Sequence, residues 1–111
     1  MPAYRFNVLK NTRDFNRVFR DGTKFSSRNM IAICLPSSDQ KCGVAVSSKV
    51  RVAPKRNLAK RRLREILRNH LDLLPSHTTL VLFAKPGFDR ERYCKLEEEY
   101  IELMKRVRHA F

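Results

Sequence analysis

The densest group of chemically active side chains is a run of cations between residues 55 and 68. Seven of these residues are Lys or Arg, and Glu65 is the only acid among them. Arginine offers planar donors that match a phosphate group, and lysine adds a compact positive charge. Like charges repel along a helix, so an external polyanion would compensate them. The run therefore favours contact with a nucleic-acid backbone over a helix that is merely solvated, because solvated helices usually mix both signs.

The remaining reactive residue types lack the spacing that chemistry requires. The cysteines and histidines never approach the pairs that ligate zinc, and there is no G-x-S-x-G, Walker or G-x-G-x-x-G motif. The one run of acids, residues 97–99, is interpreted as a solvated helix face rather than as an acid–base pair. The sequence therefore offers no catalytic site of its own.

The net charge of +13 is unevenly distributed along the 111 residues. Residues 1–70 carry 17 Lys and Arg against four acids, whereas residues 71–111 carry seven of each sign. This asymmetry favours a polyanionic partner, either nucleic acid or an anionic membrane surface. The length predicts a single domain over residues 1–111. The three scattered cysteines, and the absence of a secretory leader or a long apolar run, favour a reduced, cytoplasmic setting.

Two aromatic residues form a second candidate site. Phe15 and Phe19 are four residues apart and are interleaved with Arg13, Arg17 and Arg20. They could pack in the core, or they could form a platform for single-stranded nucleic acid, where each stacked base contributes roughly 1–3 kcal/mol. The residues alone leave both interpretations open.

Patterned segments predict the elements that must position these side chains. Residues 12–20 predict a helix capped by Asn11 or Thr12 and ended by Gly22. Residues 29–35 and 43–48 predict two strands joined by a hairpin loop, with a weaker strand around Lys24 and Phe25.

The second half continues with a helix, a strand and a helix. Residues 54–74 predict a helix with Pro54 in its first turn and Pro75 after its end, and residues 79–84 predict a strand. Asp89 is the predicted cap of the last helix. The apolar stripe of that helix comprises Tyr93, Leu96, Tyr100, Met104, Val107 and Phe111.

This order predicts an α/β fold, an α+β sandwich in which helices pack on a small mixed sheet. Residues 43–84 form a β-α-β unit, and its crossover is ordinarily right-handed.

The basic run and the two phenylalanines resemble those of the protein component of bacterial ribonuclease P, and the resemblance covers almost the whole chain. The shared features are an opening pattern of Leu9, Phe15, Phe19 and Gly22, the strand G-V-A-V-S-S-K-V, the basic motif R-N-L-A-K-R-R-L-R-E and the segment F-A-K-P-G. The chain departs from the pattern at Leu58, where the family often has an arginine directly after the R-N pair.

The resemblance implies a subunit that binds a catalytic RNA and helps it remove the 5′ leader from precursor tRNA. It implies that the RNA and its Mg²⁺ ions perform the hydrolysis, with no small-molecule substrate and no membrane. It also implies a left-handed β-α-β crossover. The leader-binding residues would be Phe15, Phe19, Arg17 and Lys49. The residues that bind the RNA subunit would be Arg56, Asn57, Lys60, Arg61, Arg62, Arg64 and Arg68.

Three other interpretations of the sequence remain. The chain could be a different RNA-binding module, such as a ribosomal protein or an assembly factor. It could be a stand-alone nuclease, or its basic amphipathic helix could lie on a membrane surface.

Overall fold

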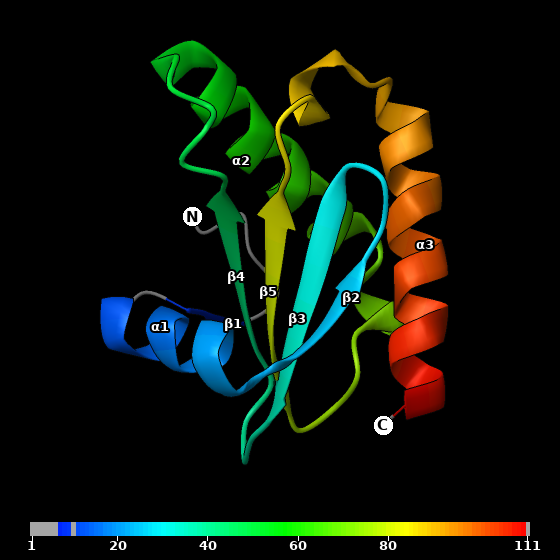
Figure 1. Cartoon of the computed structure of the whole chain (residues 1–111). Coiled ribbons are helices and arrows are strands. Elements are labelled where there is room, and N and C mark those ends of the chain that lie inside the picture. Colours follow the sequence, from blue (N-terminus) through cyan, green and yellow to red (C-terminus); the bar gives the residue numbers. More distant parts are fainter. Residues whose placement is uncertain (1–6, 10, 111) are drawn as a thin grey trace.

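A mixed five-stranded sheet forms the centre of the computed structural model, which describes residues 7–9 and 11–110 (Figure 1). The strands lie in the order β1-β4-β5-β3-β2. Their bounds are β1 Asn7–Val8, β2 Thr23–Ser26, β3 Met30–Pro36, β4 Lys41–Val46 and β5 Thr78–Ala84. The strand expected around Lys24 and Phe25 is confirmed as β2, whereas β1 was not predicted.

The last strand of the sequence, β5, occupies the middle of the sheet. It pairs antiparallel with β3 and parallel with β4. The predicted hairpin between residues 29–35 and 43–48 is therefore wrong, because β5 separates the two strands. The physical reason is that β5 is buried on both faces, with six of its seven residues buried and an apolar run over residues 80–84, as suits a central strand.

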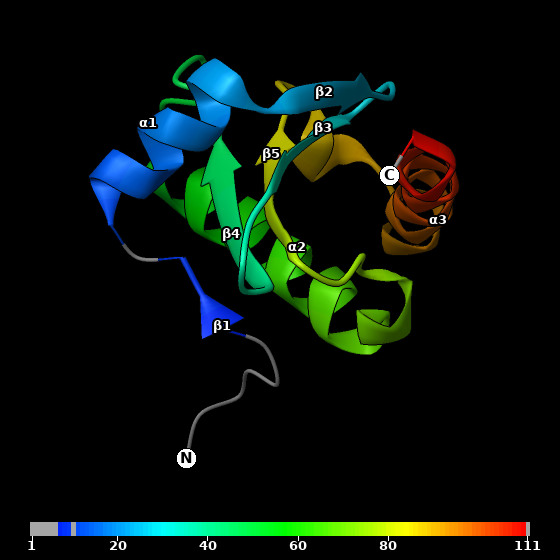
Figure 2. The ribbon, with the colours of Figure 1, turned by 90° about the horizontal axis from the view of Figure 1, so that it is seen from below.

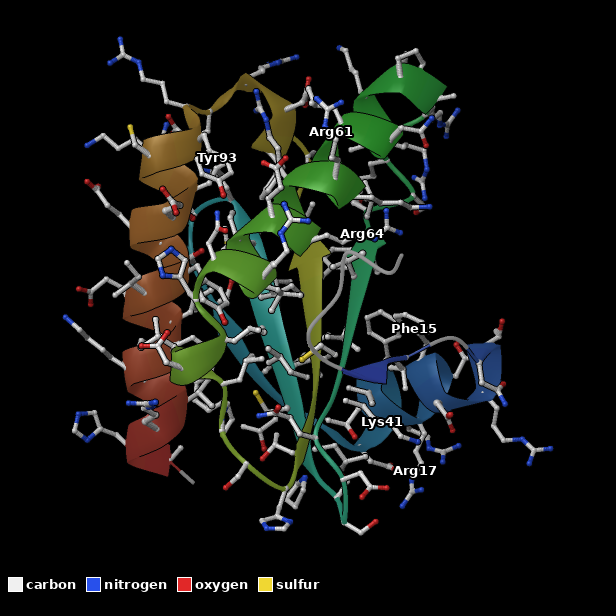
Figure 3. The ribbon with its side chains drawn as sticks, turned by 180° about the vertical axis from the view of Figure 1, so that it is seen from behind. Phe15, Arg17, Lys41, Arg61, Arg64 and Tyr93 are labelled. Carbon is white, nitrogen blue, oxygen red and sulfur yellow. The ribbon has the colours of Figure 1, made fainter. Side chains whose placement is uncertain are left out.

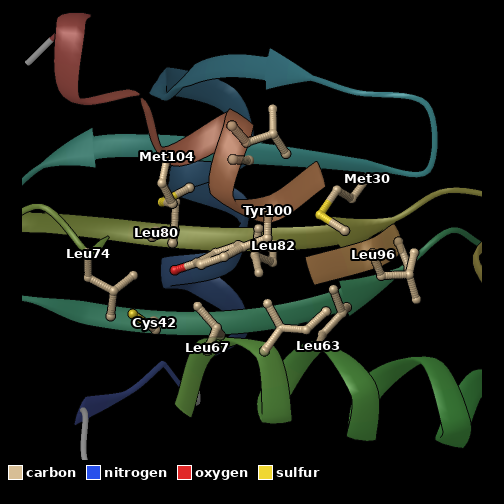
Figure 4. Close-up of a cluster of buried hydrophobic side chains, with 14 of the residues drawn as sticks. Met30, Cys42, Leu63, Leu67, Leu74, Leu80, Leu82, Leu96, Tyr100 and Met104 are labelled. Atoms are coloured by element: carbon tan, nitrogen blue, oxygen red, sulfur yellow. The ribbon is translucent and has the colours of Figure 1, made fainter. Parts of the chain in front are cut away.

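Helices cover both faces of the sheet, and the predicted α+β sandwich is confirmed. The helix α1, Thr12–Asp21, lies on one face, whereas α2, Ala53–Asn69, and α3, Tyr93–Ala110, lie on the other (Figures 1 and 2). The larger core lies between the sheet and the helices α2 and α3 (Figure 4). A smaller core, centred on Val18, Ile33 and Val81, lies beneath α1.

The crossover from β4 through α2 into β5 is left-handed. In Figure 1 both strands point upward, β5 lies to the right of β4, and α2 lies behind the sheet. Figure 3 shows the same unit from behind, with α2 in front and the order of the strands reversed. The right-handed crossover expected from general topology is wrong, and the handedness implied by the family resemblance is confirmed.

The termini of α1 agree with the sequence pattern. The Oδ1 atom of Asn11 accepts a hydrogen bond from the backbone N–H of Arg13 at 2.9 Å. At the other end the N–H of Gly22 donates to the carbonyl of Val18 at 2.8 Å. These two contacts satisfy backbone groups that every helix end leaves unpaired.

The other two helices differ from the prediction at one end each. The helix α2 ends at Asn69, and Leu71–Leu73 form a separate 3-10 turn, η1. The predicted cap at Asp89 is wrong, because Asp89 lies inside a second 3-10 turn, η2, Phe88–Arg90. This turn follows Gly87, whose φ of 94° suits glycine. The predicted stripe of α3 is buried except for half-buried Tyr93, and Phe111 lies outside the described residues.

No helix in the described part of the chain is both long and apolar enough to cross a membrane.

Candidate nucleic-acid interface

The buried side of α2 determines which of its cations face outward. Leu63, Ile66 and Leu67 are buried against the sheet. Lys60, Arg61 and Arg64 lie on the outer side, and their charged groups make no hydrogen bond or ion pair with any residue that the structure describes. Figure 3 shows Arg61 and Arg64 projecting from this surface, which we call the α2 face. An arc of uncompensated cations on a rigid helix is suited to tracking a phosphate backbone.

Other cations of the basic motif are used inside the protein. The Nη1 atom of Arg56 donates to the carbonyls of Ser47 and Val50 at 2.9 and 2.8 Å. The Nη1 atom of Arg62 donates to the carbonyl of Glu91 at 3.3 Å. The side chains of Arg56 and Arg62 are both half-buried. The structure therefore divides the predicted RNA-subunit-binding set into outward-facing cations and cations that hold neighbouring loops.

The remaining members of that set also lie on α2. Asn57 is exposed near its first turn, and Leu58 beside it is half-buried. Arg68 is half-buried in the last turn, beside Tyr93 of α3, whose pKa is raised mainly by burial of the hydroxyl. All members of the predicted set therefore lie on α2, and their contacts with RNA stay a prediction.

The two aromatic residues of α1 pack on the opposite side of the sheet. Phe15 and Phe19 are stacked with ring centroids 6.5 Å apart, and Phe19 meets Phe83 of β5 edge-on at 6.2 Å. Phe15 lies over Gly43 of β4, where an added Cβ would be only 2.7 Å from its Cζ atom. Both rings are half-buried. They are thus anchored to the sheet while part of each surface stays open to solvent.

A row of half-buried side chains continues this aromatic surface across the sheet. Ala45 is in register with Phe83, which is in register with Ile31 on the far side. Phe83 contacts Phe19 directly, and Ile31 and Ala45 pack, as Phe15 and Phe19 do, against the smaller core beneath α1. We call these five residues the apolar strip. Its exposed π-faces and aliphatic groups could stack with unpaired bases of any sequence.

Arg17 lies away from the aromatic rings. It borders a cavity of about 260 Å³ together with Asp14 and Lys41, and neither Phe15 nor Phe19 lines that cavity. Figure 3 places Arg17 and Lys41 together below Phe15. The structure therefore does not join Arg17 to the apolar strip, and its role toward a leader stays a prediction. Sequence reasoning missed Lys41, because nothing in the spacing relates it to α1.

Lys49, the fourth predicted leader-binding residue, is exposed in the loop between β4 and α2. In Figure 1 this loop lies at the upper end of the sheet, where the chain leaves β4 and turns back into α2 behind it. The loop that carries Lys49 therefore connects β4 to the helix on the opposite face of the sheet.

Two acids of residues 97–99 have structural roles, so their interpretation as a solvated face is wrong for them. The carboxylate of Glu99 accepts hydrogen bonds from Ser27 Oγ at 2.7 Å, and from the N–H and side-chain amide of Asn29 at 2.9 and 2.6 Å. Glu97 lies 2.8 Å from the Nε2 atom of His70. Glu98 alone is well exposed. The acids thus tie α3 to the β2–β3 turn and to the end of α2.

The potential metal ligands and nucleophiles remain dispersed. Among residues 7–9 and 11–110 there is no group of three or more His, Cys, Asp or Glu side chains that could hold a metal ion. Cys34 and Cys42 are buried, and burial raises the pKa of each thiol to about 12. Cys94 is exposed on α3. The buried thiols are therefore packing residues rather than nucleophiles.

Comparison with known proteins identifies relatives over nearly the whole chain. The family model for Ribonuclease P matches residues 4–108. A protein of Pelotomaculum thermopropionicum, a ribonuclease P protein component, is 33% identical over 103 residues, which cover 91% of this chain and 92% of the relative. A ribonuclease P protein component of Streptococcus pneumoniae is 29% identical over 99 residues, covering 87% and 80% of the two chains.

Solved structures share the fold. The RNase P protein from Thermotoga maritima superposes with a TM-score of 0.79 at 25% identity, covering 90% of this chain and 96% of that one. The Staphylococcus aureus RNase P protein has a TM-score of 0.78 at 20% identity, covering 90% and 94%. The arrangement of α1 and α2 on opposite faces of the sheet therefore occurs in known structures.

Proposed function

This chain belongs to the ribonuclease P protein family and is a protein subunit of the ribonucleoprotein that matures tRNA 5′ ends; from that premise we propose how its surfaces divide the RNA ligands. The α2 face binds the RNA subunit, and the apolar strip binds the single-stranded leader of precursor tRNA. The observation that carries the proposal is the placement of α2 and α1 on opposite faces of the sheet, because Lys60, Arg61 and Arg64 belong to α2 and Phe15 and Phe19 belong to α1.

The two surfaces suit the two ligands for different physical reasons. Cations that contact phosphates give affinity with little sequence information, which suits a large structured RNA. Half-exposed aromatic rings stack with any base, which suits leaders of differing sequence. A polycation between two RNAs also screens their mutual repulsion, so the precursor binds more tightly.

We further propose that hydrolysis belongs to the RNA subunit, with Mg²⁺ bound mainly there. Phosphate oxygens and water are ligands that Mg²⁺ prefers, and an RNA supplies them in abundance. On this proposal the protein binds and orients the substrate without forming or breaking a bond. We place the assembly in the cytoplasm, because the three cysteines are free thiols that suit a reducing compartment.

Reconstitution tests the RNA-subunit surface. Adding this chain to ribonuclease P RNA at low Mg²⁺ should stimulate leader cleavage, whereas the chain alone should not cleave precursor tRNA. Arg61→Ala should reduce the slope of log affinity against log salt by about one unit, as expected for one lost phosphate contact. Lys105→Ala is the control, since Lys105 lies on α3 beside Glu102 and should leave the slope unchanged. Equal slopes for both variants would reject the α2 face.

The leader surface needs a separate test. Phe19→Ala should lower affinity for precursor tRNA more than affinity for mature tRNA, by roughly 5- to 100-fold for the loss of one stacked base. Circular dichroism and urea unfolding would establish that the variant remains folded. An equal loss for precursor and mature tRNA would show that Phe19 serves the core alone. Robust cleavage by the RNA-free chain would instead favour the stand-alone nuclease.

A further inference from the structure

The loop between β4 and α2 is an ordered turn that carries exposed cations. Ser47, which begins it, is buried and donates its N–H to the carbonyl of Ala84 at 2.9 Å. The N–H of Lys49 donates to Ser47 Oγ at 3.2 Å, and the N–H of Val50 donates to the Ser47 carbonyl at 3.0 Å. Lys49 and Arg51 are exposed, and their charged groups contact no acid within the described residues.

One side chain from the following helix closes this turn. Arg56, one turn into α2, directs its Nη1 atom at both the Ser47 and the Val50 carbonyls. Ser47 lies two residues before Lys49 and Val50 lies directly before Arg51, so the two contacts fix the backbone that carries both cations. Hydrogen bonds from a charged donor are stronger than neutral ones. A guanidinium engaged in this way also has fewer donors left for a phosphate.

We propose that Arg56 is a positioning residue for RNA binding, and that residues 48–51 form a preorganised phosphate-binding loop which it holds. We call this segment the 48–51 loop. The inference rests on the proposed function and changes the role of one predicted contact residue. Arg56 acts through Lys49 and Arg51, and the partner of those two side chains is the RNA phosphate backbone.

The position of the loop gives this arrangement its importance. The loop passes over the end of the sheet, from β4 to α2 on the opposite face (Figure 1). Ala45 of β4 belongs to the apolar strip. Cations mounted there lie between the proposed leader surface and the proposed RNA-subunit surface. A fixed loop places positive charge at that junction without first losing conformational entropy on binding.

The first experiment measures hydrogen exchange in the free protein. Arg56→Met keeps the aliphatic stem and removes the donors, and Arg61→Met is the matched control on the same helix. Exchange of the Lys49 and Val50 amides should accelerate roughly 10- to 100-fold in Arg56→Met, given the strength of hydrogen bonds to charged groups. It should be unchanged in Arg61→Met. Unchanged protection in Arg56→Met would overturn the inference. If that variant unfolds, Arg56→Gln, which retains a shorter donor, is measured against Arg61→Gln.

The second experiment measures affinity for ribonuclease P RNA across a salt titration. The Lys49→Ala/Arg51→Ala double variant should lose about two units of salt slope. Arg56→Met should lose more than one unit, because it loosens the backbone that carries both cations, and adding it to the double variant should cause little further loss. This non-additivity is the signature of a residue that acts through others. Additive losses would overturn the inference by making Arg56 an independent phosphate contact.

The two experiments separate this inference from the proposed function. If Arg61→Met and the loop variants all leave RNA affinity unchanged, the RNA-binding surface itself is wrong. If Arg61→Met weakens binding but Arg56→Met and the loop variants lose slope independently, the α2 face stands and only the positioning role fails.

Discussion

Gly43→Ala tests whether Phe15 is seated on β4 as the structure shows. The added Cβ would lie 2.7 Å from Phe15 Cζ and 3.1 Å from Leu9 Cβ. Ordinary contact begins at about 3.4 Å, so the ring must retreat by roughly 0.7 Å. Such overpacking lowers the free energy of unfolding by about 1–3 kcal/mol. Replacing a glycine within a strand by alanine raises it by about 0.5–1 kcal/mol, because the unfolded chain has less freedom. The free energy of unfolding should therefore fall by about 1 kcal/mol, within a range of roughly 0–2.5 kcal/mol.

The same displacement should weaken leader binding, because it tilts Phe15 away from its partner ring. Affinity for precursor tRNA should fall on the order of tenfold relative to mature tRNA, within the range for one stacked base. The assays are urea unfolding at constant ionic strength and fluorescence titration with the two RNAs. Phe15→Leu in the Gly43→Ala background should relieve the clash, with a coupling free energy of at least about 0.5 kcal/mol.

Gly87→Ala provides the control. Gly87 has a φ of 94°, so alanine there is strained by about 1–2 kcal/mol, yet its Cβ meets no atom within 4 Å. This variant should lose stability without changing the preference for precursor over mature tRNA. If Gly43→Ala is as stable as the parent and retains that preference, the placement of Phe15 over Gly43 is refuted.

The remaining predictions concern α3 and the thiols. Glu99→Ala should lower the free energy of unfolding by about 1–3 kcal/mol by leaving the Asn29 amide unpaired, whereas Glu98→Ala should change it by less than about 0.5 kcal/mol in urea titrations. Cys34 and Cys42 have pKa values raised to about 12, so between about pH 9 and pH 12 the unfolded chain releases thiol protons that the folded protein retains. Stability should therefore fall as pH rises through this window, by about 1.4 kcal/mol per pH unit for each thiol, and Cys42→Ala should flatten the decline. A thiol reagent should label Cys94 alone in the native state and all three cysteines in denaturant; rapid native labelling of a buried thiol would contradict the packing.

Local pattern was sufficient to predict most elements, because their determinants are close in sequence. The cap at Asn11, the apolar stripe of Leu63, Ile66 and Leu67, and the β-rich run at 79–84 each act within a few residues. The pairing of strands was not predictable in this way. The loop after Pro36 looked like a hairpin because its length and composition suit one, and only the insertion of β5 overrules it.

The candidate site was predictable in residue type but not in role. Arg56 and Arg61 are indistinguishable in a basic run, and only the carbonyls of Ser47 and Val50 reveal that Arg56 faces inward. The resemblance grouped Arg17 with Phe15, yet residues two apart lie on different sides of a helix, and Arg17 borders a cavity that Phe15 does not line. Sequence identifies the side chains available for contact, whereas tertiary structure decides what each one contacts.

The central position of β5 constrains how the polypeptide can assemble during synthesis. Until residues 78–84 leave the ribosome, β3 can pair only with β2, and β4 can pair with β1 but not with its central neighbour. By then the emerging segment already includes the whole cationic run of α2. It still lacks β5, the strand that joins the two halves of the sheet. Productive folding is therefore delayed until the last third of translation, and the incomplete nascent chain is a polycation exposed to ribosomal RNA.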